Sequence, residues 1–227
     1  MTASQPEPGG TVLGADGRPG GWVVAEVGPS GVRWHDVLEV RGLLDLAAAT
    51  GARVVAADVP IGLPSSGTRA CDGAARRRLG GRAASSVFAA PVRRALDFTT
   101  YAEARPHLPT LSAQTFALVP RIRDTDDALR EAGAHDLVVE CHPEVTFREL
   151  TGQVLPRKKS APGALQRLRA LEQVYGPLPL DPPVGAALDD ALDALACAWT
   201  AQRVARGVHE VLGGALDDTG VPMRIVV

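Results

Sequence analysis

Asp190 and Asp193 are the residues whose type and spacing most clearly suit chemistry. They lie three residues apart in the alanine- and leucine-rich run LDDALDALACAWTA, so on a helix they share one face. Carboxylates this close repel one another unless a cation lies among them, and oxygen ligands suit hard divalent ions. The helix dipole can explain Asp189 and Asp190 in a first turn, but Asp193 lies too far into the helix for that explanation.

Two further acids follow predicted strands. Asp16 stands in GADGRPGG after a strand over 11–16, and Asp58 ends the apolar run RVVAADVPIG. If these strands are neighbours, both acids lie within reach of a helix packed across the same edge. The alternatives are an Asp-Gly turn for Asp16 and a turn cap before Pro60 for Asp58. Together with the helical pair, these acids predict a two-metal site bridged by Asp16.

The segment ECHPE, at the end of a second buried strand, adds candidates to this group. Glu140 is a possible further metal ligand, and His142 a possible general base. The alternative is structural, with the acids capping a helix and the histidine hydrogen-bonded in the core. The sequence leaves both readings open.

Arginines concentrate between residues 69 and 94, with little negative charge among them. Guanidinium groups match phosphate geometry, so this segment is a candidate phosphate-binding surface for a polyanion; the alternative is a solvated helix face. Lys158 and Lys159, in the polar turn LPRKKSAPG, either reach a phosphate or lie in a solvated loop. The arginines of the segment are Arg69, Arg76, Arg77, Arg78, Arg82, Arg93 and Arg94.

The elements that position these residues alternate between strand and helix patterns, which predicts an α/β fold. The polar, Pro- and Gly-rich residues 1–10 are expected to form a disordered tail, and residues 11–227 a single domain. The Arg- and Gly-rich segment 63–95 is expected to be a polar loop. The expected strands are 11–16, 21–27 and 32–40 in an antiparallel meander, then 53–62, 136–144 and 223–227. The expected helices are 41–50, 143–151, 160–176 and 184–207, with further helical stretches near 111–133.

Composition excludes several classes of protein. The 227 residues carry a net charge of −2 and are 45% hydrophobic, enough for a core. No apolar run approaches the roughly 20 residues of a membrane span. Three scattered cysteines without a C-x-x-C pair favour a reduced, cytoplasmic chain. Motifs for a phosphate-binding loop, a nucleophile elbow and a zinc helix are absent, and 4% aromatic content disfavours single-strand binding through stacking.

Six ordered blocks resemble the domain of unknown function 429 family, which comprises predicted nucleases of the RNase-H-like fold. The resemblance covers about residues 12–207, and D-A-L-D-A-L-A is also similar to the final acidic helix of Holliday-junction resolvases. The blocks are GADGRPGGWVVAEV, DVPIGLP, ACDGAARRRLGGRAASSVFAAPVR, LSAQTFALVPRIRDTD, ECHPEVTFRELTG and DDALDALACAWTAQRVARG.

The resemblance implies an RNase-H-like fold, with a five-stranded mixed sheet of three antiparallel then two parallel strands and helices on both faces. It makes Asp16, Asp58, Asp190 and Asp193 candidate metal ligands. We therefore expect a nuclease that cleaves phosphodiester bonds with two Mg²⁺ or Mn²⁺ ions. The alternative is a non-catalytic, kinase-like or chaperone-like protein that binds a nucleotide or small phosphorylated ligand. RNA or DNA as substrate, and monomer or homodimer as assembly, stay open.

Overall fold

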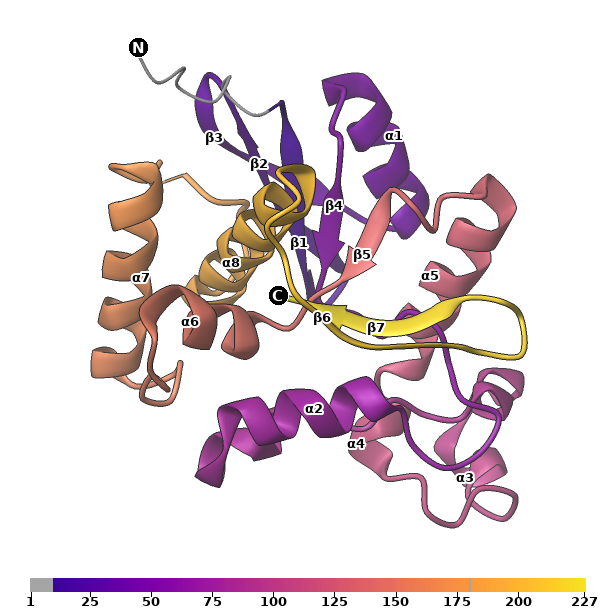
Figure 1. Cartoon of the computed structure of the whole chain (residues 1–227). Helices are drawn as coiled ribbons and strands as arrows, with labels where there is room; N and C mark the ends of the chain where they lie inside the picture. The colour runs from indigo at the N-terminus through magenta and orange to yellow at the C-terminus, as the bar shows by residue number, and fades with distance from the viewer. Residues whose placement is uncertain (1–9, 180) are drawn as a thin grey trace.

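A five-stranded mixed sheet forms the centre of the computed structural model, which describes residues 10–179 and 181–227 (Figure 1). The strand order is β3-β2-β1-β4-β5; β1, β2 and β3 are antiparallel, whereas β1, β4 and β5 are parallel. The strands are β1 (Val12–Arg18), β2 (Gly21–Gly28), β3 (Gly31–Val37), β4 (Val55–Ala57) and β5 (Val138–Glu140). The predicted α/β class and mixed sheet are confirmed, and the RNase-H-like class stays a prediction.

Helices pack on both faces of this sheet, because successive residues of a strand point to opposite faces. Leu13 and Ala15 of β1 face a core built with α1 (Val40–Thr50) and α5 (Val119–Ala132). Val12 of β1 and Ala56 of β4 face the other core, which includes residues of α8. The helices on that side are α6 (Pro143–Thr151), α7 (Ala161–Tyr175) and α8 (Leu188–Ala205).

The segment predicted as a loop over 63–95 contains a helix, α2 (Ala70–Leu79), followed by the 3-10 turns η1 (Gly81–Ser86) and η2 (Arg93–Asp97). Its apolar face is narrow, with Cys71, Ala75 and Leu79 buried at a spacing of four residues. Three consecutive arginines conceal this period in the sequence. The helical stretches predicted near 111–133 are α4 (Ala113–Phe116) and α5, and a short α3 (Tyr101–Ala104) precedes them.

The chain ends in a hairpin of β6 (Val211–Leu216) and β7 (Pro222–Val226), of which only the second strand was predicted. Gly213 and Gly214 interrupt the strand pattern of β6, because glycine carries no side chain to show alternation. Val226 forms a parallel bridge with Cys141, which places the hairpin beside β5. No helix among the described residues is long and apolar enough to cross a membrane. The tail predicted for residues 1–10 lies, except for Gly10, outside the described residues.

Candidate functional site

Asp16 and Asp58 lie side by side where two parallel strands end. Ala15 pairs with Ala57 in the ladder of β1 and β4, and the amide of Asp58 donates to the carbonyl oxygen of Ala15 at 3.0 Å. Each acid stands two residues after a residue that faces α8, so both carboxylates point toward that helix. The sequence-based expectation that these strand ends are neighbours is therefore confirmed.

Asp193 joins them from α8, and the three carboxylates form what we call the acid cluster. Asp16 is 6% exposed and Asp193 is 2% exposed. Among the described residues, Asp16 has no side-chain hydrogen bond, and Oδ1 of Asp193 is buried without a partner. Burial, followed by the charges of Asp58 and Asp193, raises the pKa of Asp16 well above its ordinary value. The cluster therefore holds negative charge that its surroundings compensate poorly.

Burial also raises the pKa values of the other two members. That of Asp193 rises to about 7, although the nearby ammonium of Lys158 opposes the change. For Asp58 the charges of His142, Lys158 and Arg121 partly oppose the upward shift. Like charges in a desolvated setting disfavour ionisation of every member, and this is a recognised feature of functional sites.

Lys158 supplies the positive charge nearest to Asp193, whereas the sequence favoured a solvated loop or a phosphate contact. Its Nζ lies 2.6 Å from Oδ2 of Asp193 and 3.7 Å from Oδ2 of Asp189. Burial alone would lower the pKa of Lys158, but the carboxylates of Asp193, Asp16 and Asp189 raise it above its ordinary value. Lys158 and Lys159 do lie in a partly exposed turn, but the ammonium of Lys158 binds Asp193 of the acid cluster.

Asp190 lies at the edge of this group. Its Oδ2 accepts a hydrogen bond from the amide of Ala187 at 3.1 Å, at the start of α8. The charge of Asp190 raises the pKa of Asp16 less than the charges of Asp58 and Asp193 do. The helix-start alternative therefore describes Asp190, whereas Asp193 lies inside the cluster.

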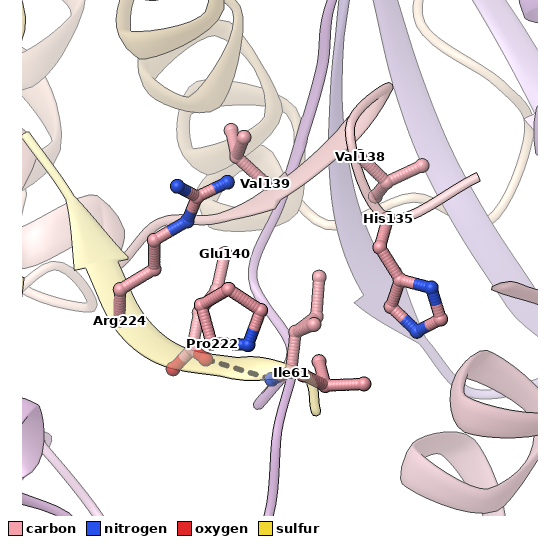
Figure 2. A pocket seen from close by; sticks show the side chains of 8 residues that line it. Ile61, His135, Val138, Val139, Glu140, Pro222 and Arg224 are labelled. Carbon is pink, nitrogen blue, oxygen red and sulfur yellow. Dashed lines mark hydrogen bonds between the residues drawn. The ribbon is translucent and has the colours of Figure 1, made fainter. Parts of the chain in front are cut away.

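Glu140 belongs to the opposite face of the sheet, and its predicted role as a metal ligand is wrong. It pairs with Ala57, whose side chain packs in the core of α1 and α5. Its carboxylate accepts from the amide of Ile61 at 2.7 Å, as Figure 2 shows, and binds the guanidinium of Arg69 at 2.6 and 2.7 Å. The adjoining cavity, beside Pro222 of β7, measures about 10 Å³, which is room for about one water molecule.

Arg69 is likewise structural, which corrects its prediction as a phosphate ligand. It is 3% exposed, and its guanidinium binds Glu140 and Asp72 and donates to the carbonyl oxygens of Ile61 and Gly62. A side chain enclosed in this way has no donor left for a substrate. The network instead ties α2 to β5 and to the loop that follows Asp58.

The remaining arginines divide into two groups. Nε of Arg76 donates to the carbonyl oxygen of Val87 at 2.9 Å, and Arg78 forms ion pairs with Glu149 and Glu210 at 2.8 and 2.7 Å. The contacts of Arg78, with those of Arg93 to Asp126 and Asp217, correct the prediction that these two arginines are free to bind phosphate, whereas Arg76 uses only its Nε in this way. The side chains left exposed are Arg77, Arg82, Arg94 and Lys159.

His142 lies at the border of the acid cluster. It occupies the N-cap position of α6, is half-buried, and in its protonated form lowers the pKa of Asp58. Its Nε2 lies 3.2 Å from the carbonyl oxygen of Ser86, which can only accept, so Nε2 carries the proton. Nδ1 then holds the lone pair of the neutral ring, and it has no partner among the described residues.

Sequence reasoning missed Arg121, which lies on the α5 face of the sheet while its charge acts on Asp58 at the strand end. Its guanidinium lies 5.2 Å from the centre of the Trp22 ring and donates to the carbonyl oxygen of Arg18 at 2.9 Å. A Cβ at Gly17 would overlap this guanidinium. The glycine directly after Asp16 was therefore a usable sign that another group crosses the strand end.

Glu144 was missed for a different reason. Its carboxylate binds the buried guanidinium of Arg167 at 2.7 and 2.8 Å, and its charge also acts on Asp58 and Asp193. It stands in the ECHPE segment but was not singled out, because an acid early in a helix has an ordinary explanation in the helix dipole.

The donor set of the acid cluster suits a hard divalent ion, because every free ligand atom is a carboxylate oxygen. The unpartnered Oδ1 of Asp193 is the observation that speaks for such a fit. Even so, no group of three or more Asp, Glu, His or Cys side chains within residues 10–179 and 181–227 is already arranged to hold a metal ion. Side-chain adjustment around Lys158 would accompany binding.

Comparisons with known proteins give one family and no individual relative. No curated protein matches the chain, and no solved structure does. The family model described as "Protein of unknown function (DUF429)" matches residues 14–217, a range that includes Asp16, Asp58, Lys158 and Asp193. The chain therefore belongs to the DUF429 family.

Proposed function

We propose that this protein is a divalent-metal-dependent nuclease that hydrolyses phosphodiester bonds of RNA or DNA. The observation that carries the proposal is the convergence of Asp16, Asp58 and Asp193 at the ends of two parallel strands, with poorly compensated charge and a free buried oxygen on Asp193. A bound Mg²⁺ or Mn²⁺ would supply an activated water and stabilise negative charge on the phosphate. Asp16, Asp58 and Asp193 would hold it.

The neighbouring side chains have roles that follow from their placement. Nδ1 of His142 is the proton acceptor available next to Asp58, because Nε2 is used by the carbonyl of Ser86. Arg121 acts on the acid cluster through its charge, which lowers the pKa of Asp58 from the α5 face of the sheet. The exposed Arg77, Arg82 and Lys159 contact phosphates farther along the strand. The three cysteines are buried and free, which suits the reducing conditions of the cytoplasm.

The test is a cleavage screen with RNA, duplex DNA, an RNA–DNA hybrid and branched DNA, in Mg²⁺ or Mn²⁺ and again in excess EDTA. We expect cleavage of at least one substrate, its loss in EDTA, and a decrease of at least about 100-fold in Asp16→Asn. Asp45→Asn is the matched control, because Asp45 is exposed on α1. We expect it to keep full activity.

Two outcomes would contradict the proposal. One is activity that Asp16→Asn retains in full, because the acid cluster would then not be the site. The other is the absence of cleavage on every substrate together with tight binding of a mononucleotide. That result would favour the alternative of a nucleotide-binding protein on the same fold.

A further inference from the structure

Lys158 places an ammonium group within the acid cluster. Its Nζ is 2.6 Å from Oδ2 of Asp193, while Oδ1 of the same carboxylate is buried and unpartnered. One oxygen of Asp193 is thus used by an ammonium, and the other is free for a different cation. This division of a single carboxylate between two positive partners is the starting point of the inference.

The charges of the acid cluster balance with one divalent ion. When ionised, Asp16, Asp58 and Asp193 together with the ammonium of Lys158 leave two negative charges. A single Mg²⁺ or Mn²⁺ neutralises them, whereas two such ions would leave excess positive charge in a buried setting, which is costly.

The other acids nearby already have partners. Glu144 is paired with the buried guanidinium of Arg167. Asp189 and Asp190 lie in the first turn of α8, where the helix dipole stabilises negative charge, and Asp190 also accepts from the amide of Ala187. These acids therefore add little demand for a second ion.

The chain holds Lys158 in place from both sides. Arg167 donates to the carbonyl oxygen of Pro156 at 2.8 Å, and Ser160 donates to that of Arg157 at 2.7 Å while its own Oγ caps α7. Gly163 leaves room for the backbone of Arg157, since a Cβ at this position would overlap it. These contacts fix the backbone next to Lys158, and contacts of this kind hold the residues of functional sites in position.

We propose that Lys158 serves as the second cation of the acid cluster, so that the site binds one divalent ion rather than the two expected from the sequence. This inference rests on the proposed function only in taking the acid cluster as the metal site. Lys158 thereby acts as a positioning residue that fixes Asp193 and sets the number of ions.

The test is the stoichiometry of Mn²⁺ binding to the full chain without nucleic acid, measured by calorimetric titration and by elemental analysis after desalting. We expect one ion for the wild type and two for Lys158→Met, which keeps the stem but removes the charge. This variant leaves Asp189 as well as Asp193 without its ammonium partner, so four carboxylates balance two divalent ions. Lys158→Arg, which keeps the charge, and Lys159→Met, a change at the exposed neighbour, should both bind one ion. Lys158→Gln provides a second neutral variant if Lys158→Met does not fold.

Two ions in the wild type would overturn the inference, and so would neutral variants that fold and still bind one ion or none. A wild type that binds no ion would also overturn it. Failure of the proposed function gives a different result, because one bound ion without cleavage of any nucleic acid would contradict the nuclease and leave the role of Lys158 intact. Two bound ions in an active nuclease would contradict only the role of Lys158.

Discussion

Gly14 of β1 lies directly against the backbone of Ala194 in α8. A Cβ at Gly14 would overlap the carbonyl oxygen of Ala194 and the amide of Ala198. Only glycine permits this approach, which brings the first turns of α8 to the end of β1. Gly14 stands two residues before Asp16, and Ala194 directly follows Asp193. The contact between Gly14 and Ala194 therefore brings Asp16 and Asp193 together.

We therefore expect Gly14→Ala to displace α8 and to lower the free energy of unfolding by about 3 kcal/mol, the upper range for added atoms in a packed core. Urea unfolding followed by circular dichroism measures this change. Gly73→Ala is the matched control, because a Cβ there meets only the flexible tip of Arg77. In a helix that substitution should increase stability, by up to about 1 kcal/mol. Equal stability of the two variants would contradict the packing argument.

The acid cluster predicts an unusual pH dependence of stability in the absence of divalent ions. An acid whose pKa is raised on folding binds its proton more tightly in the folded state, so stability falls as the pH rises above the unfolded pKa of about 4. For Asp193, whose folded pKa is about 7, the loss extends from about pH 4 to pH 7. Asp16 shifts in the same direction.

Asp16→Asn should accordingly raise the melting temperature at pH 8 in EDTA, by roughly 2–4 °C for each kcal/mol of repulsion removed, and raise it less at pH 5. It should also abolish the gain that Mg²⁺ or Mn²⁺ gives to the wild type. Asp16 is a better choice than Asp193, which would lose its ion pair with Lys158. The exposed Asp45→Asn should change nothing at either pH. A less stable Asp16→Asn at pH 8 would mean that this carboxylate makes a structural hydrogen bond.

The buried network of Arg69 predicts a structural effect separate from the site. Arg69→Met leaves the carboxylates of Glu140 and Asp72 without their partner, and breaking such a buried pair costs about 3–5 kcal/mol. Arg77→Met on the exposed side of the same helix should cost less than about 0.5 kcal/mol. Chemical unfolding of both variants gives the comparison. Similar values for the two would remove the role of Arg69 in tying α2 to β5.

Much of the fold and the core of the site were predictable from local patterns. The strand-like run before Asp16 and the apolar run before Asp58 located two neighbouring strand ends, and the spacing of Asp190 and Asp193 located the helix across them. Each of these patterns lies within a single element. A helical or strand period is visible in one stretch of sequence, so it predicts which face carries an acid.

The partners of these acids were not predictable, because they come from distant segments. Lys158 meets Asp193 from 35 residues away, and Arg69 meets Glu140 from 71 residues away. No period in the sequence links such pairs. Glu140 and Cys141 are consecutive residues at the end of one strand, so the sequence alone predicts that they face opposite sides of the sheet. Which side each residue faces follows only from the structure, in which Cys141 packs in the core with α8 and Glu140 pairs with Ala57.

The hydrogen bonds of the Asp217 carboxylate lead us to expect a loss of stability in acid. Burial alone would raise its pKa, but its carboxylate accepts from the amides of Leu63 and Val221, from Thr219 and from the guanidinium of Arg93, and these donors hold the pKa well below its usual range. An acid with a lowered folded pKa contributes stability above its unfolded pKa of about 4, and this contribution is lost as the pH falls further.

Asp217→Asn should therefore lower the free energy of unfolding by about 2 kcal/mol at pH 7, the scale of hydrogen bonds to a charged group. The difference from the wild type should shrink as the pH falls below 4. Asp218→Asn, at the exposed neighbouring position, should follow the wild type throughout. Urea unfolding at pH 7, 5 and 3 distinguishes these cases, and a constant difference at all three would contradict the assignment.

The exposed arginines distinguish a polynucleotide substrate from a small ligand. Arg77 and Arg82 project from α2 and η1, and the end of η1 contacts His142 beside the acid cluster. Each phosphate that a protein neutralises releases counterions, so affinity falls with salt by a slope of about 0.9 per contact on duplex DNA. In an Asp16→Asn background, which binds without cleaving, replacing both arginines with Ala should weaken binding and flatten this slope.

The matched control replaces Arg33 and Arg53, which are exposed at the opposite end of the sheet. In the strand register, Arg33 of β3 lies opposite Glu26 of β2, which in turn lies opposite Leu13 near the start of β1. Arg53 lies just before the start of β4. This control removes the same charge from the protein but should leave the slope unchanged, because these side chains lie far from the strand ends that carry the acids. Fluorescence anisotropy of a labelled oligonucleotide between low and moderate salt gives both slopes. Equal slopes for the two double variants would show that only net charge matters, and the arginines of α2 and η1 would then have no specific role in binding the substrate.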